Sequence, residues 1–141
     1  MAGARIIVFD AGDQDQLVRD IAAGFPTSII DDKRKSPMHG YRAVHVIVSH
    51  PLPYEIQVRT TLEHAWAQLS ERLADHYGFE LKYGGGPTSV RDALLAFSDF
   101  FAALGALVAD GRGGVLNEQA AQNAQVMLTR LPEILEALEI K

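Results

Sequence analysis

The chain has 141 residues, of which 48% are hydrophobic and 22% charged, and its formal net charge is −5. This length is enough for one domain with a hydrophobic core, and the acidic balance argues against non-specific nucleic-acid binding by the whole surface. The sequence contains no cysteine, which excludes disulfides and zinc sites built from thiolates.

No stretch of the sequence has the pattern of a targeting or membrane segment. It shows no charged-then-apolar leader, and no apolar run reaches the roughly 20 residues that span a bilayer. We therefore expect a cytoplasmic protein without a membrane segment.

The first residues predict a strand followed by a helix. Residues 5–9 (RIIVF) are a continuous apolar run, which is typical of a central strand covered on both faces. The run ends at Asp10, and Asp13 is placed to cap a helix over residues 14–24. This helix has one apolar side, formed by Leu17, Val18 and Ile21.

A short strand over residues 27–30 is predicted next, so that the chain opens as strand, helix, strand. Residues 31–39 (DDKRKSPMH) are polar and predict a loop. The loop carries three adjacent cations, Lys33, Arg34 and Lys35, which suit a ligand with several phosphates or an RNA backbone. A solvated turn is the alternative.

Two alternating strands joined by a short turn follow. Residues 41–49 and 54–59 each alternate in side-chain character, and the turn between them contains two prolines and cannot continue a ladder. We expect an antiparallel register that buries one apolar face, formed by Val44, Val46, Val48, Ile56 and Val58. The opposite face then collects Tyr41, His45, Glu55, Gln57 and Arg59. These are the groups of a ligand-binding floor, and a solvated strand face is the alternative.

Helices are predicted for the rest of the chain. The first is capped by Thr60 or Thr61 and has an apolar stripe formed by Leu62, Ala65, Trp66, Leu69 and Leu73. Residues 84–87 (GGGP) predict a flexible joint, and residues 90–109 predict a helix that is apolar nearly all round and should be buried or pack on a partner. A final helix should break or kink at Pro132. The elements predict a mixed α/β (α+β) fold with about four strands, packed helices and C-terminal helices.

Two motifs carry a resemblance to a known family. Residues 40–45 (GYRAVH) and 54–60 (YEIQVRT), with their spacing and the following helix that contains Trp66-Ala67, resemble the central motifs of the RelA/SpoT synthetase domain. This family comprises the alarmone pyrophosphokinases, and the following helix resembles the continuation found in its small single-domain members, with a toxic synthetase type as the other alternative. The resemblance covers roughly residues 2–86 and implies a nucleotidyltransferase-like arrangement. We therefore expect a partial synthetase domain over residues 1–86 and a helical extension over residues 87–141.

The resemblance implies an activity and a set of roles. The expected reaction transfers pyrophosphate from ATP to the 3′-hydroxyl of GDP or GTP, with Mg²⁺ as cofactor. Glu55 corresponds to the catalytic glutamate that helps to hold the metal, and Tyr41 to a tyrosine that stacks on the guanine. The match places His45, Gln57 and Arg59 at the acceptor nucleotide. An ion pair between Glu55 and Arg59 is the structural alternative for the carboxylate.

The sequence also departs from the family pattern. Pro37 occupies a position where a lysine is usual, which leaves Lys35 and Arg34 as the candidate phosphate ligands, and His39 stands where asparagine is common. The family's magnesium-binding aspartate would come immediately before Met1. We therefore expect the chain to be an N-terminally truncated, acceptor-binding half of a synthetase.

The sequence is also compatible with three alternatives to pyrophosphate transfer to GDP or GTP. Toxic relatives pyrophosphorylate the 3′ end of tRNA or make adenosine alarmones, and the two motifs do not separate these acceptors from GDP or GTP. A non-catalytic module that binds guanine nucleotides or a protein partner is the other class. The C-terminal helices are a candidate surface for a second copy of the chain or for an antitoxin.

Overall fold

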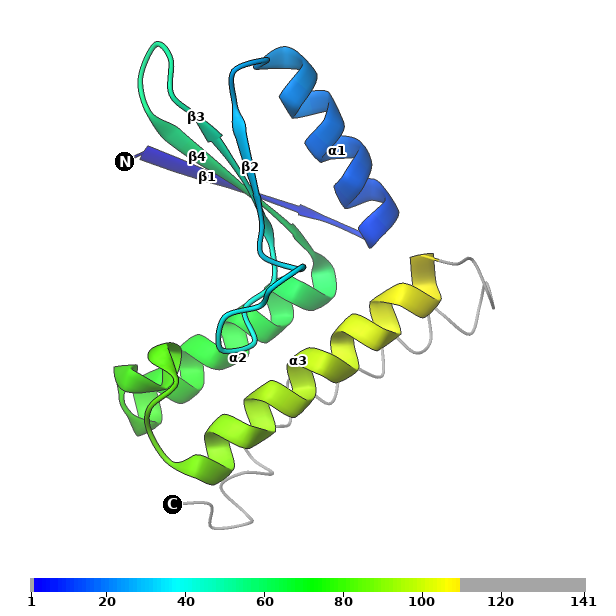
Figure 1. The fold of residues 1–141 in the computed structure, drawn as a ribbon. Coiled ribbons are helices and arrows are strands. Elements are labelled where there is room, and N and C mark those ends of the chain that lie inside the picture. The colour runs from blue at the N-terminus through cyan, green and yellow to red at the C-terminus, as the bar shows by residue number, and fades with distance from the viewer. Residues whose placement is uncertain (1, 110–141) are drawn as a thin grey trace.

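The computed structural model of the protein describes residues 2–109. Along the chain its elements are β1 (Ala2–Val8), α1 (Ala11–Gly24), β2 (Ile29–Asp32), β3 (Val44–Val48), β4 (Tyr54–Thr60), α2 (Thr61–Tyr77), the 3₁₀ helix η1 (Phe79–Tyr83) and α3 (Thr88–Ala109). The sheet and α1 form one part of the molecule, and α2 and α3 extend from its end as an antiparallel pair (Figure 1). The predicted mixed α/β class with a four-stranded sheet is confirmed.

The strand order is β1-β4-β3-β2, with β1 parallel to β4 and the other neighbours antiparallel. The prediction of a central, doubly covered first strand is wrong, because β1 pairs only with β4 and forms an edge of the described sheet. Its Ile7 is 46% exposed, and Phe9, just beyond the strand, is 57% exposed. An apolar run predicts burial, but the pairing of the strands decides how much of that surface is covered.

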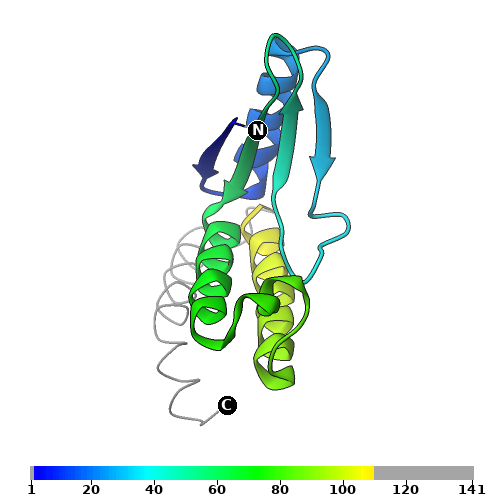
Figure 2. The ribbon, with the colours of Figure 1, turned by 90° about the vertical axis from the view of Figure 1, so that its left-hand side faces the viewer.

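The predicted register of the hairpin is confirmed. Val44 lies opposite Val58 and Val46 opposite Ile56, and the valines of this face are almost completely buried. They form a core with Val18 of α1, against which Leu17 and Ile21 also pack. Helix α1 covers this face of the sheet, and no described helix lies in front of the other face in Figure 2.

Several boundaries differ from those predicted. Strand β2 lies two residues further along than expected, and β3 does not include Tyr41, which forms an isolated bridge with Met38. Helix α1 begins at Ala11 and is capped by Asp10 and not by Asp13. Because the backbone of Asp10 is extended, its carboxylate turns back and accepts the N–H of Asp13 at 2.8 Å.

Helix α2 begins with a capping box, in which Thr60 accepts the N–H of Glu63 and the Glu63 carboxylate accepts the N–H of Thr60. Because both donors at the helix start are satisfied, the end of β4 passes directly into the helix. Arg59, the residue before the last of β4, lies with its Nη1 3.5 Å from Nδ1 of His64 near the start of α2.

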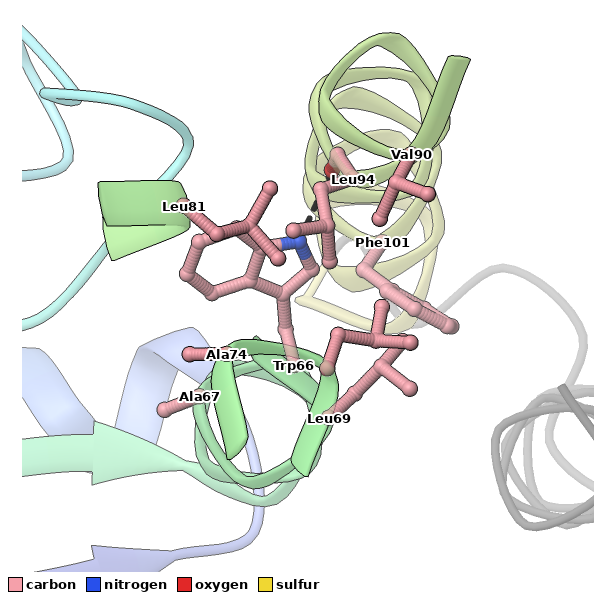
Figure 3. Packing of buried hydrophobic residues seen from close by; sticks show 9 residues of the cluster. Trp66, Ala67, Leu69, Ala74, Leu81, Val90, Leu94 and Phe101 are labelled. Atoms are coloured by element: carbon pink, nitrogen blue, oxygen red, sulfur yellow. Dashed lines mark hydrogen bonds between the residues drawn. The ribbon is translucent and has the colours of Figure 1, made fainter. Parts of the chain in front are cut away.

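A second core lies between α2, η1 and α3 (Figure 3). Its large buried side chains are Trp66, Leu69, Leu73, Leu81, Val90, Leu94 and Phe101. The Trp66 indole N–H donates to the Leu94 carbonyl at 2.8 Å, which ties α2 to α3. Of the two alternatives predicted for α3, complete burial is not observed, since Phe100 is 50% exposed, and packing on a partner stays a prediction. The predicted final helix lies outside the described residues.

Among the helices between residues 2 and 109, none combines the length and hydropathy that a membrane crossing requires.

Candidate functional site

The face of the sheet opposite α1 carries a closed ring of polar contacts. Arg59 Nη2 donates to the Tyr41 hydroxyl at 3.2 Å, and this hydroxyl lies 2.9 Å from His45 Nε2. His45 Nδ1 lies 3.3 Å from Glu55 Oε2. On the other arm, Arg59 Nη2 also donates to Gln57 Oε1 at 3.2 Å, and Gln57 Nε2 donates to Glu55 Oε1 at 2.9 Å. The structure thus brings together five residues that the sequence placed on one face.

The ring has one consistent direction of donation. The Glu55 carboxylate accepts, so a neutral His45 carries its proton on Nδ1, and its Nε2 accepts from the Tyr41 hydroxyl. Both arms of the ring therefore start at the Arg59 guanidinium and end on the two oxygens of Glu55. The direct ion pair between Glu55 and Arg59, the structural alternative, is absent from the described contacts.

His45 is neutral in this arrangement, and its surroundings favour the neutral form. Burial lowers the pKa of His45 below its ordinary value of 6.5, while the Glu55 carboxylate opposes this shift and the Lys33 ammonium adds to it. A neutral imidazole can accept from Tyr41, whereas an imidazolium cannot. Protonation of His45 would therefore reverse the Tyr41–His45 hydrogen bond, with Nε2–H donating to the hydroxyl oxygen.

A pH prediction follows for the His45 site. Because the pKa of His45 is lower in the folded protein than the unfolded value of about 6.5, the unfolded state binds the extra proton as pH falls below 6.5. The stability that neutral His45 contributes is fully present above that pH, and it is lost progressively as the pH falls toward the folded pKa. We expect urea unfolding at pH 7 and pH 5.5 to show a smaller loss of stability in His45→Gln than in the wild type. An equal loss in both proteins would contradict a neutral, buried His45.

Arg59 is a buried cation at the origin of the ring. The residue is 6% exposed, its guanidinium lies 5.3 Å from the centre of the Tyr41 ring, and its Nε has no hydrogen-bond partner in the structure. No carboxylate among residues 2–109 pairs with it. A buried charge is costly unless it is paired, so Arg59 provides an unneutralised positive charge beside Tyr41.

A hollow of about 200 Å³ opens at the Tyr41 end of the ring. It is lined by Met38, His39, Tyr41, Arg59, Trp66, Ala67, Ser70, Glu71 and Lys82. A larger, mostly apolar cavity of about 380 Å³ lies between the starts of α1 and α2 and helix α3, and it contains no residue of the ring. We locate the candidate site at the ring and its hollow, because the buried cation, the imidazole and the catalytic candidate Glu55 converge there.

The structure turns Arg34, one of the two predicted phosphate ligands, away from this ring. Arg34 turns toward α1, where it bonds to the Asp32 carboxylate at 2.7 Å and to Asp15 and Gln14 at 2.8 and 3.0 Å. The hydrogen bond from Arg34 lowers the pKa of Asp32. Lys35 lies exposed in the turn. Arg34 therefore ties the loop to α1 and faces away from the ring.

Replacement of Arg34 tests this assignment. Arg34→Gln removes charge-assisted bonds to two carboxylates, so we expect the free energy of unfolding to fall by about 1–3 kcal/mol. Binding of guanine nucleotide should stay unchanged, because the side chain faces α1. Urea denaturation and calorimetry measure the two quantities. Unchanged stability together with lost nucleotide binding would place Arg34 at the phosphates instead.

The structure adds residues that the sequence reasoning did not select. Register places Asp31 opposite His45 and Arg5 opposite Gln57, so both lie on the face of the ring. Lys33 lies beside Asp31, with 2.8 Å between its Nζ and the carboxylate. The sequence alone could have identified Asp31 and Arg5, because strand alternation, if continued through β1 and β2, assigns them to the same face. His64 of α2 lies 3.5 Å from Arg59 Nη1.

The face of the ring offers few oxygen ligands for Mg²⁺. Within the described part of the chain there is no group of three or more acidic, histidine or cysteine side chains that could hold a metal ion. Magnesium is commonly bound through one or two carboxylates together with substrate phosphates and water. Glu55, about one quarter exposed at its side chain, fits the role of a single carboxylate ligand.

Comparison with known proteins gives relatives of sequence and of fold. No model of a known protein family matches the chain. The chain is 44% identical over 94 residues to uncharacterised proteins of Mycobacterium tuberculosis and Mycobacterium bovis, a match that covers 62% of this chain and 33% of theirs. The chain thus spans about one third of the length of these curated relatives.

Solved structures share the fold. Small alarmone synthetase 1 from Bacillus subtilis, bound to its product pppGpp, matches with a TM-score of 0.62 at 23% identity, over 79% of this chain and 61% of that chain. Small alarmone synthetase 2 from the same organism gives 0.63 at 23% identity, over 82% and 65%. A GTP pyrophosphokinase family protein from Streptococcus pneumoniae gives 0.56 at 22% identity, over 83% and 61%. The resemblance to the RelA/SpoT synthetase domain is confirmed as a likeness of fold.

Proposed function

We propose that the chain belongs to a diphosphotransferase that moves pyrophosphate from ATP to the 3′-hydroxyl of GDP or GTP, forming a guanosine tetra- or pentaphosphate alarmone. The observation that carries the proposal is the ring itself. It joins the residues of the two motifs into one network, ends on a carboxylate and begins on a buried cation. The alarmone synthetase fold supports the same proposal.

In the proposed reaction Glu55 is the general base. It takes the proton of the acceptor's 3′-hydroxyl, whose oxygen then bonds to the β-phosphorus of ATP while the bond from that phosphorus to the α–β bridging oxygen breaks and AMP leaves. Gln57 and His45 each bond to one oxygen of Glu55, so they orient the carboxylate. Tyr41 would present its ring to the guanine, with the hollow beside it receiving the base.

In this scheme Arg59 contributes to binding of the acceptor nucleotide by holding Tyr41 in place. Its guanidinium lies against the Tyr41 ring and donates to the hydroxyl, which fixes the ring's position. Its unpaired positive charge also favours a nucleotide, which is an anion, over a neutral ligand. Magnesium, with Glu55 as its protein ligand, would neutralise charge on the transferring phosphates.

The acceptor is tested directly by transfer of label. The protein is incubated with ATP labelled in its β and γ phosphates and with GDP, GTP, AMP or the 3′ end of tRNA, in the presence and absence of Mg²⁺. We expect label in guanosine tetra- or pentaphosphate, and only with magnesium. Label in tRNA or in an adenosine product would show that the acceptor is tRNA or an adenosine nucleotide and not a guanine nucleotide. Binding of GDP without any transfer would favour a non-catalytic nucleotide-binding module.

A further inference from the structure

Lys33 lies at the border of the ring face and has no part in the scheme above. Its backbone N–H donates to the Ala43 carbonyl at 2.9 Å, so the ladder between β2 and β3 continues one step beyond the end of β2. Asp31 lies opposite His45 in that ladder. Strand alternation therefore puts Lys33, two residues after Asp31, on the same face as His45. Ala43, opposite Lys33 in the ladder, is completely buried.

The Lys33 ammonium interacts electrostatically with residues of the ring. The pKa of Lys33 is raised mainly by its hydrogen bond to Asp31, and the Glu55 carboxylate raises it further. In turn, the Lys33 ammonium lowers the pKa of His45. Lys33 therefore lies close enough to Glu55 and His45 to contribute to the electrostatic field of the ring.

The resting partner of Lys33 is easily exchanged. The ion pair with Asp31 is exposed, at 36% for the lysine side chain and 44% for the aspartate, and such pairs contribute little net stability. A phosphate has more negative charge and more acceptor oxygens than one carboxylate, so it competes well for the ammonium. Lys35, by contrast, is exposed in the turn beyond the ladder.

We propose that Lys33 binds the phosphates of the acceptor nucleotide and that Asp31 is its counterion while the site is empty. This inference rests on the proposed function, because it takes the acceptor to lie on the ring face with its base at Tyr41. It assigns the phosphate contact to the first of the three loop cations. Lys33 is then a specificity residue for a phosphorylated acceptor over a bare nucleoside.

The test compares two lysines of the same loop. Lys33→Gln and Lys35→Gln remove the same charge, two positions apart, and calorimetry in magnesium-free buffer measures binding of GDP and of guanosine to each. We expect Lys33→Gln to weaken GDP binding about 10-fold or more, as for a lost hydrogen bond to a charged group. Guanosine binding to this variant should stay unchanged, and Lys35→Gln should bind both ligands as the wild type does.

A third variant examines the counterion. Asp31→Asn removes the competing carboxylate, so we expect GDP binding that is equal to or tighter than that of the wild type. Equal weakening of GDP by Lys33→Gln and Lys35→Gln, or loss of guanosine binding in Lys33→Gln, would overturn the inference. Loss of GDP binding in Asp31→Asn would overturn the counterion role. Failure of the wild type to bind either ligand would instead defeat the proposed function itself.

Discussion

Glu55→Gln should reduce pyrophosphate transfer by about 10²–10⁴-fold, the range that a general base contributes. Glutamine has the same shape and keeps one acceptor oxygen, but it cannot take the proton of the attacking hydroxyl. Acceptor affinity should stay within roughly threefold of wild type, because the loss falls on kcat and not on KM. Initial rates of transfer at saturating nucleotide, with calorimetry of GDP binding, measure both quantities.

Glu80→Gln is the matched control for this variant. Glu80 is exposed on η1 and takes no part in the ring, so the same chemical change there should leave transfer at the wild-type rate. If Glu55→Gln kept about one tenth of the activity or more, the proton would have another acceptor and Glu55 would not be the base. A parallel loss of GDP affinity would show that Glu55 binds the acceptor instead of activating it.

The alternation of the hairpin was sufficient to predict the site face. A period of two leaves only two ways to orient a strand, and burial of Val44 and Val58 excludes one of them. The positions of His45, Glu55 and Gln57 follow from that choice without further information. Sequence therefore predicted which residues share the face, though not the ring of contacts among them.

The direction of the loop side chains could not be predicted from sequence in the same way. Arg34 and Lys33 are adjacent cations, yet one bonds to Asp15 of α1 and the other to Asp31 on the ring face. Their directions depend on how far the β2–β3 ladder extends and on where α1 lies, which are long-range features. The edge position of β1 is another such feature, because its apolar run has the same composition as a buried strand.

Tyr41 lies outside β3, so its position depends on packing and not on strand alternation. The preceding residue, Gly40, has φ of +89°, and a Cβ built there would lie 2.7 Å from Trp66 Cζ2 and 3.2 Å from Ser98 Cβ. The Gly40 carbonyl accepts from Ser98 Oγ at 2.5 Å. Helices α2 and α3 thus hold the backbone that carries Tyr41, and they link the second core to the ring.

Gly40→Ala should therefore have the largest structural effect of any single methyl group added at this site. The positive φ disfavours an L side chain, and the new methyl group would overlap the Trp66 ring, which is itself held by its bond to Leu94. We expect the free energy of unfolding to fall by roughly 2–4 kcal/mol. Urea denaturation measures the loss, and calorimetry should show weakened GDP binding because Tyr41 is displaced.

Gly105→Ala on α3 is the control, since a Cβ at that glycine meets no atom within 4 Å. Alanine is favoured over glycine inside a helix, so this variant should be more stable by about 0.5–1 kcal/mol, with GDP binding unchanged. If Gly40→Ala were as stable as the wild type, Trp66 would be free to move and could not position Tyr41. If it lost stability but bound GDP normally, the two helices would support the fold without governing the acceptor face.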